Sequence, residues 1–153
     1  MRQFILCVTL IASSLFANAQ KENTGYNKTL ADSLGADDYG MKKYVFVILK
    51  TGANKTTDKY FIDSMFSGHM NNIGKLTELS KLIVAGPMLV KNDKEYRGIF
   101  VLNTSSLDEA KTLLQTDPAI HSNLLESEMY SWYCSAALPM FLPFHDKVRK
   151  KSF

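Results

Sequence analysis

The sequence contains only two cysteines and one tryptophan in 153 residues, and neither sign of charge dominates it. The formal net charge is +3, and the lysines and arginines are scattered except near the C-terminus. Such a distribution forms no basic stripe, so no nucleic-acid partner is expected. Hydrophobic residues make up 46% and charged residues 22% of the chain, which indicates one ordinary globular domain.

Long apolar runs are also missing, apart from one at the N-terminus. Arg2 precedes a mostly apolar stretch over residues 4–16, and residues 17–19, Ala-Asn-Ala, have the small-residue pattern of a cleavage site. We therefore predict a signal peptide over residues 1–19 and export to the periplasm or out of the cell. A retained membrane anchor is the alternative, but the run is short and polar residues follow it, so no stable anchor is expected.

Few residues that support covalent or metal chemistry are present. Removal of the signal peptide would leave one cysteine, Cys134, which cannot form an internal disulfide and which we expect to be a small buried apolar residue. The three histidines, His69, His121 and His145, lack metal-ligand spacing. No glycine-rich phosphate loop appears. We therefore expect neither a metal site nor a cofactor.

A regular alternation of strand and helix patterns follows a polar leader at residues 20–41. The expected strands are 43–50, 81–85, 96–103 and 124–134, and the expected helical segments are 29–34, 58–80, 106–116 and 119–122. Gly86 and Pro87 should end the second strand, because proline cannot donate to a ladder. Between residues 42 and 135 this order predicts an α+β, ferredoxin-like βαββαβ domain with a four-stranded antiparallel sheet.

The apolar content of the strands predicts an association. The first and third strands are apolar at consecutive positions, so both faces of the sheet need cover, whereas two crossover helices cover one face only. We predict that the same face of a second copy covers the other, in a symmetric homodimer. The C-terminal extension, residues 136–153, begins too apolar for a free tail and should pack on the domain or its mate. A short basic helix is expected around residues 145–151.

The helix expected at residues 58–80 carries the candidate site residue. Its apolar stripe, with steps of three and four, consists of Phe61, Met65, His69, Ile73, Leu76 and Leu79. His69 should therefore point inward. Gly68 beside it suggests a kink or a close backbone approach. In the second long helix, the residues expected to face inward are Leu107, Ala110, Leu113 and Leu114.

Several of these features, in this order, resemble the YciI-like (YCII-related domain) family. They are His69 on its leucine-bearing helix, the run Leu82-Ile83-Val84-Ala85-Gly86-Pro87, the strand with Gly98, the helix with Glu109-Ala110, and Asp117-Pro118 before the strand that reaches Trp132. The similarity covers residues 42–132. The sequence departs from the family in its signal peptide, its C-terminal extension and Asn123, where a glycine is usual and where asparagine tolerates a left-handed backbone.

The resemblance implies a dimeric α/β-barrel fold and an active site built on a histidine and an aspartate, which correspond to His69 and Asp117. In the family this histidine has also been proposed to be phosphorylated. One relative is a dehydrochlorinase that acts on a chlorinated hydroxyquinol. A histidine and a carboxylate in contact can transfer a proton near neutral pH, which suits proton abstraction beside a carbonyl or elimination from a ring.

Each candidate residue also has a simpler explanation. His69 can be a core residue with both nitrogens satisfied. Asp117 before Pro118 has the pattern of a helix N-cap, a role that is compatible with contact to His69. Tyr44 and Trp132 are the aromatic candidates for substrate contact, although aromatic residues in strands usually belong to the core. The functions left open are a cofactor-independent enzyme of lyase or isomerase type, a dimeric small-molecule-binding module without turnover, and a structural dimer.

Overall fold

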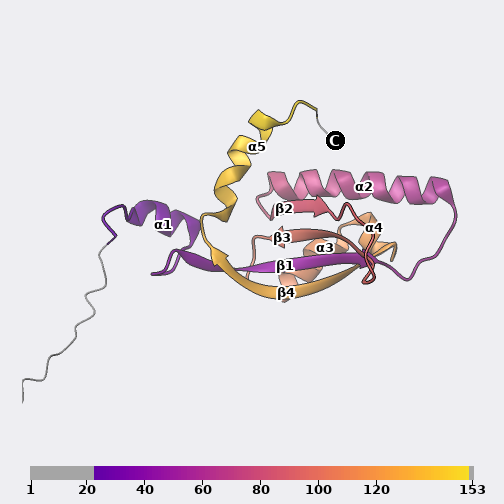
Figure 1. Ribbon diagram of the computed structural model, residues 1–153, viewed down its shortest axis with the longest axis horizontal. Helices are drawn as coiled ribbons and strands as arrows, with labels where there is room; N and C mark the ends of the chain where they lie inside the picture. The colour runs from indigo at the N-terminus through magenta and orange to yellow at the C-terminus, as the bar shows by residue number, and fades with distance from the viewer. Residues whose placement is uncertain (1–22, 152–153) are drawn as a thin grey trace, which may run out of the picture.

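The computed structural model describes residues 23–151, so the predicted signal peptide lies outside the described residues. The elements in chain order (Figure 1) are α1 (Lys28–Leu34), β1 (Met41–Thr51), α2 (Lys59–Glu78), β2 (Leu82–Pro87), β3 (Tyr96–Leu102), α3 (Leu107–Gln115), α4 (Pro118–His121), β4 (Leu125–Ser135), the 3-10 helix η1 (Leu138–Phe141) and α5 (Leu142–Val148). From β1 to β4 they include the βαββαβ order that the sequence predicts.

The four strands form one antiparallel sheet in the order β2-β3-β1-β4. β1 is central because its side chains are apolar on both faces. Val45, Val47 and Leu49 point to the helical side, whereas Tyr44 and Phe46 belong to a second apolar cluster on the other side. The predicted α+β fold with a four-stranded antiparallel sheet is confirmed. The predicted dimer stays a prediction, because the structure contains a single chain.

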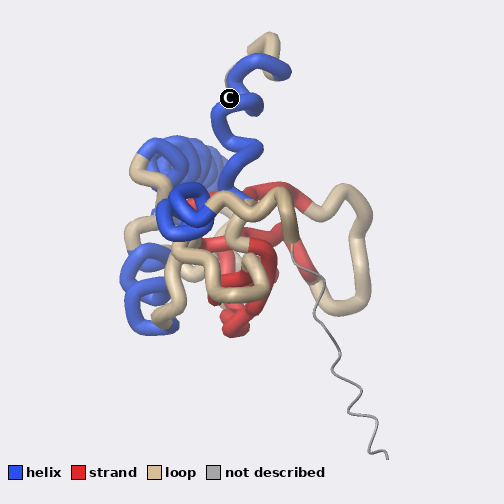
Figure 2. Tube along the Cα trace, turned by 90° about the vertical axis from the view of Figure 1, so that its left-hand side faces the viewer, coloured by secondary structure: helices blue, strands red, loops and turns tan. Residues whose placement is uncertain are grey.

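The main core lies between the sheet and the helices α2 and α3, which stand on one side of the strands (Figure 2). Side-chain caps fix where both helices begin. Asp58 accepts a hydrogen bond from the Phe61 amide, and Ser106 accepts one from the Glu109 amide, as the sequence pattern at Ser106 predicts. The buried side chains of this core are Val45, Val47, Leu49, Leu76, Leu82, Phe100, Leu102, Ala110, Leu114, Ala119, Ile120 and Leu125.

The expected end of the second strand at Gly86 and Pro87 is wrong, because β2 continues through Pro87, which pairs with Gly98. β2 is an edge strand, and a proline there can leave its donor-free side facing away from the ladder. Gly98 permits this pairing, since a Cβ at that position would lie 2.7 Å from the Gly86 carbonyl oxygen.

Two leucines expected to face inward are largely exposed. Leu79 is 58% exposed because α2 ends at Glu78 and Leu79 is only its C-cap residue. Leu107 is 45% exposed because it is the first residue of α3, at the rim of the core, while Ala110 and Leu114 further along the helix are buried. Both errors lie at helix ends, where periodicity carries the least information.

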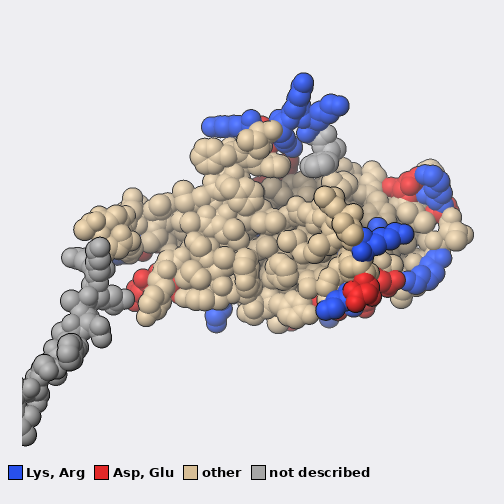
Figure 3. Space-filling view, viewed as in Figure 1, with Lys and Arg blue, Asp and Glu red and all other residues tan. Residues whose placement is uncertain are grey.

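The second face of the sheet is only partly covered. Leu138 of η1 packs against Tyr44, Ile83 and Val101 there, as expected for the start of the C-terminal extension. Beyond it, α5 begins at Leu142, earlier than predicted, and leads away from the sheet (Figure 1). Figure 3 shows basic side chains gathered over this helix.

Tyr44 gives the fold a measurable dependence on pH. Its side chain is fully buried and its hydroxyl donates a hydrogen bond of 2.9 Å to the Ser135 carbonyl. Burial, with a smaller contribution from Cys134, raises the pKa of the Tyr44 hydroxyl from 10.0 to about 12. The unfolded chain therefore releases this proton first as the pH rises. The resulting stability is fully present below about pH 10 and is lost on the way to about pH 12.

We predict that Tyr44→Phe reduces the decline in the free energy of unfolding between pH 10 and 12, measured by urea titration, despite a loss of about 1 kcal/mol at all pH values from the missing hydrogen bond. Tyr60→Phe is the matched control, because Tyr60 is 85% exposed. An unchanged pH dependence in Tyr44→Phe would contradict the burial of this hydroxyl.

Candidate active site

His69 and Asp117 meet between α2 and the start of α4. The His69 Nδ1 lies 2.6 Å from the Asp117 Oδ2, although 48 residues separate the two positions in the chain. The His69 side chain is 12% exposed and the Asp117 side chain 1%. An ionised carboxylate can only accept hydrogen bonds, so with Asp117 ionised Nδ1 carries the ring proton and donates a hydrogen bond to Oδ2. This leaves Nε2 as the unprotonated nitrogen of the neutral ring.

The second carboxylate oxygen of Asp117 caps α4. Oδ1 accepts hydrogen bonds from the Ala119 amide at 2.9 Å and the Ile120 amide at 3.4 Å, and Pro118 occupies the first helical position. Both structural roles considered for Asp117 are thus present at once, one on each oxygen. The cap holds the carboxylate still, so the orientation of the His69 ring depends on where α4 begins.

Aromatic side chains fix the other faces of the His69 ring. Phe100 of β3 stacks on it at a centroid distance of 5.8 Å and an interplanar angle of 17°, and Phe66 meets it edge-on at 6.0 Å. Among the described residues, no buried side-chain nitrogen or oxygen lacks a hydrogen-bond partner, and the bond to Asp117 is the one that the His69 ring makes. Nε2 is thus not a fully buried atom without a partner, and the His69 side chain as a whole is 12% exposed.

A close contact between α2 and α4 makes the pair possible. A Cβ built on Gly68 would lie 2.7 Å from Pro118 Cγ, closer than side chains tolerate. Of the two roles considered for this glycine, the structure shows the close approach, and α2 runs without a break from Lys59 to Glu78. Gly68 and Pro118 are the sequence neighbours of His69 and Asp117, so this contact sets the distance between the two functional groups.

A cleft of about 520 Å³ opens beside this contact, on the side of the N-terminal half of α2. Its lining is mostly apolar. The residues that line it are Phe61, Met65, Gln115, Thr116, Pro118, His121 and Ser122. Pro118 follows Asp117 in the chain and packs against Gly68 beside His69, but neither His69 nor Asp117 itself lines the cleft. Sequence periodicity assigned Phe61 and Met65 to the core and gave no signal for this opening.

Tyr44 and Trp132, the predicted substrate-contacting aromatics, lie on the other face of the sheet. They face each other across β1 and β4, with ring centroids 6.3 Å apart. Tyr44 is fully buried, while Trp132 is 37% exposed. The sheet separates both from His69, so within one chain they do not share a pocket with it. Successive side chains of a strand point to opposite faces of the sheet. The sequence did not reveal which of the two faces lies against the helix that carries His69.

Within residues 23–151, no three His, Cys, Asp or Glu side chains come close enough together to hold a metal ion. None of the helices in the same range has the length and apolar content that a membrane crossing requires.

Comparison with known proteins establishes no family. No family model matches the chain, and no curated protein matches it. Among solved structures, the chain is similar to 5-chloro-2-hydroxyhydroquinone dehydrochlorinase (TftG) from Burkholderia phenoliruptrix AC1100 in complex with 2,5-dihydroxybenzoquinone, at 22% identity and a TM-score of 0.42. The match covers 57% of this chain and 92% of that one. A likeness of this degree establishes no shared function, and membership of the YciI-like family stays a prediction.

The contact at Gly68 predicts opposite effects for two similar substitutions in α2. Gly68→Ala should lower the free energy of unfolding by about 1–3 kcal/mol, because the added methyl group pushes α4 away. Gly74→Ala should raise it by up to about 1 kcal/mol, because its Cβ would meet nothing within 4 Å and alanine favours the helix. The measurement is the free energy of unfolding of both variants in urea. Equal changes in Gly68→Ala and Gly74→Ala would show that Gly68 and Pro118 are not in close contact.

Proposed function

We propose that this protein is a small-molecule enzyme that works without a cofactor and uses His69 as the proton-transferring group, oriented by Asp117. The observation that carries the proposal is the 2.6 Å hydrogen bond from Nδ1 to a buried carboxylate, on a histidine whose side chain is 12% exposed. Such a pair provides a base of defined tautomer, with Nε2 as the nitrogen that would take the proton from a substrate.

The proposed chemistry is a proton transfer. Nε2 accepts a proton from a carbon beside a carbonyl or from a ring substituent, and the electron pair left behind forms a double bond or expels a leaving group. The imidazolium that forms is stabilised by the Asp117 carboxylate, which lies in surroundings of low polarity. The proton then returns to the product or passes to water. The class of reaction is thus an isomerisation or an elimination, and the substrate is a small carbonyl-bearing or aromatic molecule.

A binding module without turnover is the second candidate, and the apolar cleft beside Pro118 favours it. The cleft has the volume of a small-molecule site, yet His69 does not line it. A ligand held there would contact Met65 and His121 rather than the His69 pair. In that case His121→Ala would weaken binding while His69→Ala would leave it unchanged.

We predict that His69→Ala lowers turnover by about a hundredfold to ten-thousandfold, the usual contribution of a positioned general base. The measurement is a screen of small carbonyl and halogenated ring compounds with the wild-type protein, followed by kinetics on any substrate found. His145→Ala is the matched control, because His145 lies on α5, outside both the pair and the cleft. Equal turnover in wild type and His69→Ala would remove His69 from the mechanism.

Asp117→Asn separates the two roles of Asp117 in the same assay. Asparagine keeps an oxygen that can cap α4, but it removes the negative charge that stabilises the imidazolium. Little change in the melting temperature with a large fall in turnover would support the dyad. Unchanged turnover would mean that Asp117 is a cap only.

The proposal includes a homodimer through the second face of the sheet, which η1 covers only in part. Trp132 and Tyr130 are 37% and 50% exposed there, next to the partly buried Phe46. We predict that Tyr130→Lys weakens self-association at least about tenfold in sedimentation experiments. Tyr60→Lys, which changes an exposed tyrosine on α2, should have no effect. A monomeric wild-type protein at micromolar concentration would refute the dimer.

Export is also proposed, from the sequence pattern before Gln20. The test is N-terminal sequencing of the protein recovered outside the cytoplasm. Cleavage at this site would leave Gln20 as the first residue, whereas an intact Met1 would exclude a cleaved signal peptide.

A further inference from the structure

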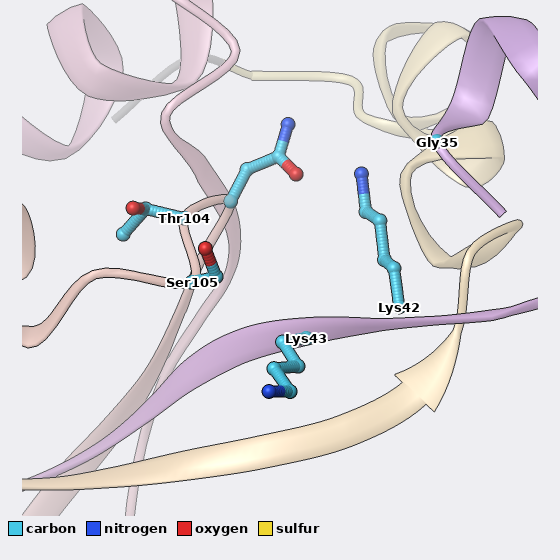
Figure 4. Close-up of a pocket in the computed structure, with 6 residues that line it drawn as sticks. Gly35, Lys42, Lys43, Thr104 and Ser105 are labelled. Carbon is cyan, nitrogen blue, oxygen red and sulfur yellow. The ribbon is translucent and has the colours of Figure 1, made fainter. Parts of the chain in front are cut away.

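A second cavity, of about 400 Å³, lies far from His69. It is lined by Gly35, Lys42, Lys43, Asn103, Thr104 and Ser105. These residues belong to the segment from the end of α1 to the start of β1 and to the loop between β3 and α3 (Figure 4). Lys42 is five residues along β1 from Val47, whose cross-strand partner Phe100 stacks on His69. At about 3.3 Å per residue, the two sites are roughly 16 Å apart along the strand.

Lys42 is a partly desolvated cation with no acidic partner. Within residues 23–151, no carboxylate lies at salt-bridge distance from its amino group. Its Nζ lies 5.0 Å from the centroid of the fully buried Tyr44 ring, which holds the side chain in place. Burial lowers the pKa of Lys42. Figure 4 shows its amino group standing in the space beside Gly35, whereas Lys43 extends to the opposite side of β1.

Two acidic groups of the surrounding segments, Glu109 and Asp37, already have hydrogen-bond partners. Glu109 accepts hydrogen bonds from Lys81 at 2.7 Å and from the Thr104 hydroxyl at 2.6 Å. Asp37 accepts from the Tyr133 hydroxyl and from two backbone amides. Neither these two carboxylates nor Asp38 of the same segment lies at salt-bridge distance from the Lys42 amino group.

The opposite wall of the cavity offers hydrogen-bond donors. Ser105 lines the same cavity (Figure 4), and its hydroxyl makes no hydrogen bond to another group in the described part of the chain. Asn103 is fixed by its backbone amide, which donates to Lys81, and by one amide hydrogen of its side chain, which donates to Ser80. The second amide hydrogen has no partner within residues 23–151, and the amide oxygen beside it is an acceptor. A positive charge on one side and the Ser105 hydroxyl as a donor on the other are surroundings that can hold an anionic oxygen group.

We propose that this cavity is a binding site for a small molecule with a carboxylate or phosphate group, in which Lys42 supplies the counter-charge and Ser105 a hydrogen bond. The volume suits a small organic anion rather than a larger cofactor. The site is independent of the proposed chemistry at His69, because no residue is shared between the two.

The test is a titration of the purified protein with inorganic phosphate and, separately, with acetate, at constant ionic strength in chloride, followed by amide chemical shifts. Saturable shifts confined to Gly35, Lys42 and residues 103–105 are expected with at least one anion. Saturation with phosphate alone identifies a phosphate-bearing ligand, and saturation with acetate alone a carboxylate. No saturable shift with either anion, or shifts centred elsewhere, would overturn the proposal.

Two lysines, one inside and one outside the cavity, provide the matched pair of variants. Lys42→Met keeps the apolar cover over Tyr44 and should raise the Kd at least about tenfold, since a charge-assisted contact is lost. Lys111→Met removes the same charge from the exposed side of α3, outside the cavity lining, and should change the Kd less than about twofold. Ser105→Ala should raise it about threefold. Equal losses in the two lysine variants, with unchanged melting temperatures, would mean general charge attraction and would refute a built site.

Discussion

The close approach of α2 and α4 at Gly68 and Pro118 is the constraint on which the candidate site depends. Only a glycine at position 68 allows the proline ring to lie so near the helix, and the sequence neighbours of these two residues are His69 and Asp117. The distance between His69 and Asp117 is thus set by backbone packing rather than by their own side chains. Any change that separates the helices also lengthens the hydrogen bond.

Asp117 connects the fold with the candidate site, because one oxygen holds the start of α4 while the other holds the His69 ring. The cap fixes the carboxylate, the carboxylate fixes the tautomer, and the tautomer leaves Nε2 as the unprotonated nitrogen. Phe100 and Phe66 complete the orientation by restricting rotation of the ring. The proton transfer that we propose at His69 would therefore require no large rearrangement of this region.

The sequence predicted the elements, their order and the cap at Asp117, because strand composition, helix periodicity and the Asp-Pro pattern are local signals. It was wrong where the outcome depends on position in the sheet or at a helix end, as with Pro87 on an edge strand and Leu107 at the first turn of α3. Tyr44 and Trp132 were grouped with His69 because sequence alone does not assign a face of the sheet. The cavity beside Lys42 was missed, since it joins segments that are about 60 residues apart and carry no common motif.

The most direct test of the account is nitrogen NMR of the His69 ring in the folded protein, which reports which nitrogen carries the proton. The account predicts that the neutral ring is protonated at Nδ1, that this proton exchanges slowly with water, and that its signal is lost in Asp117→Asn while α4 stays folded. A neutral ring protonated at Nε2, or one whose signals do not respond to Asp117→Asn, would contradict it.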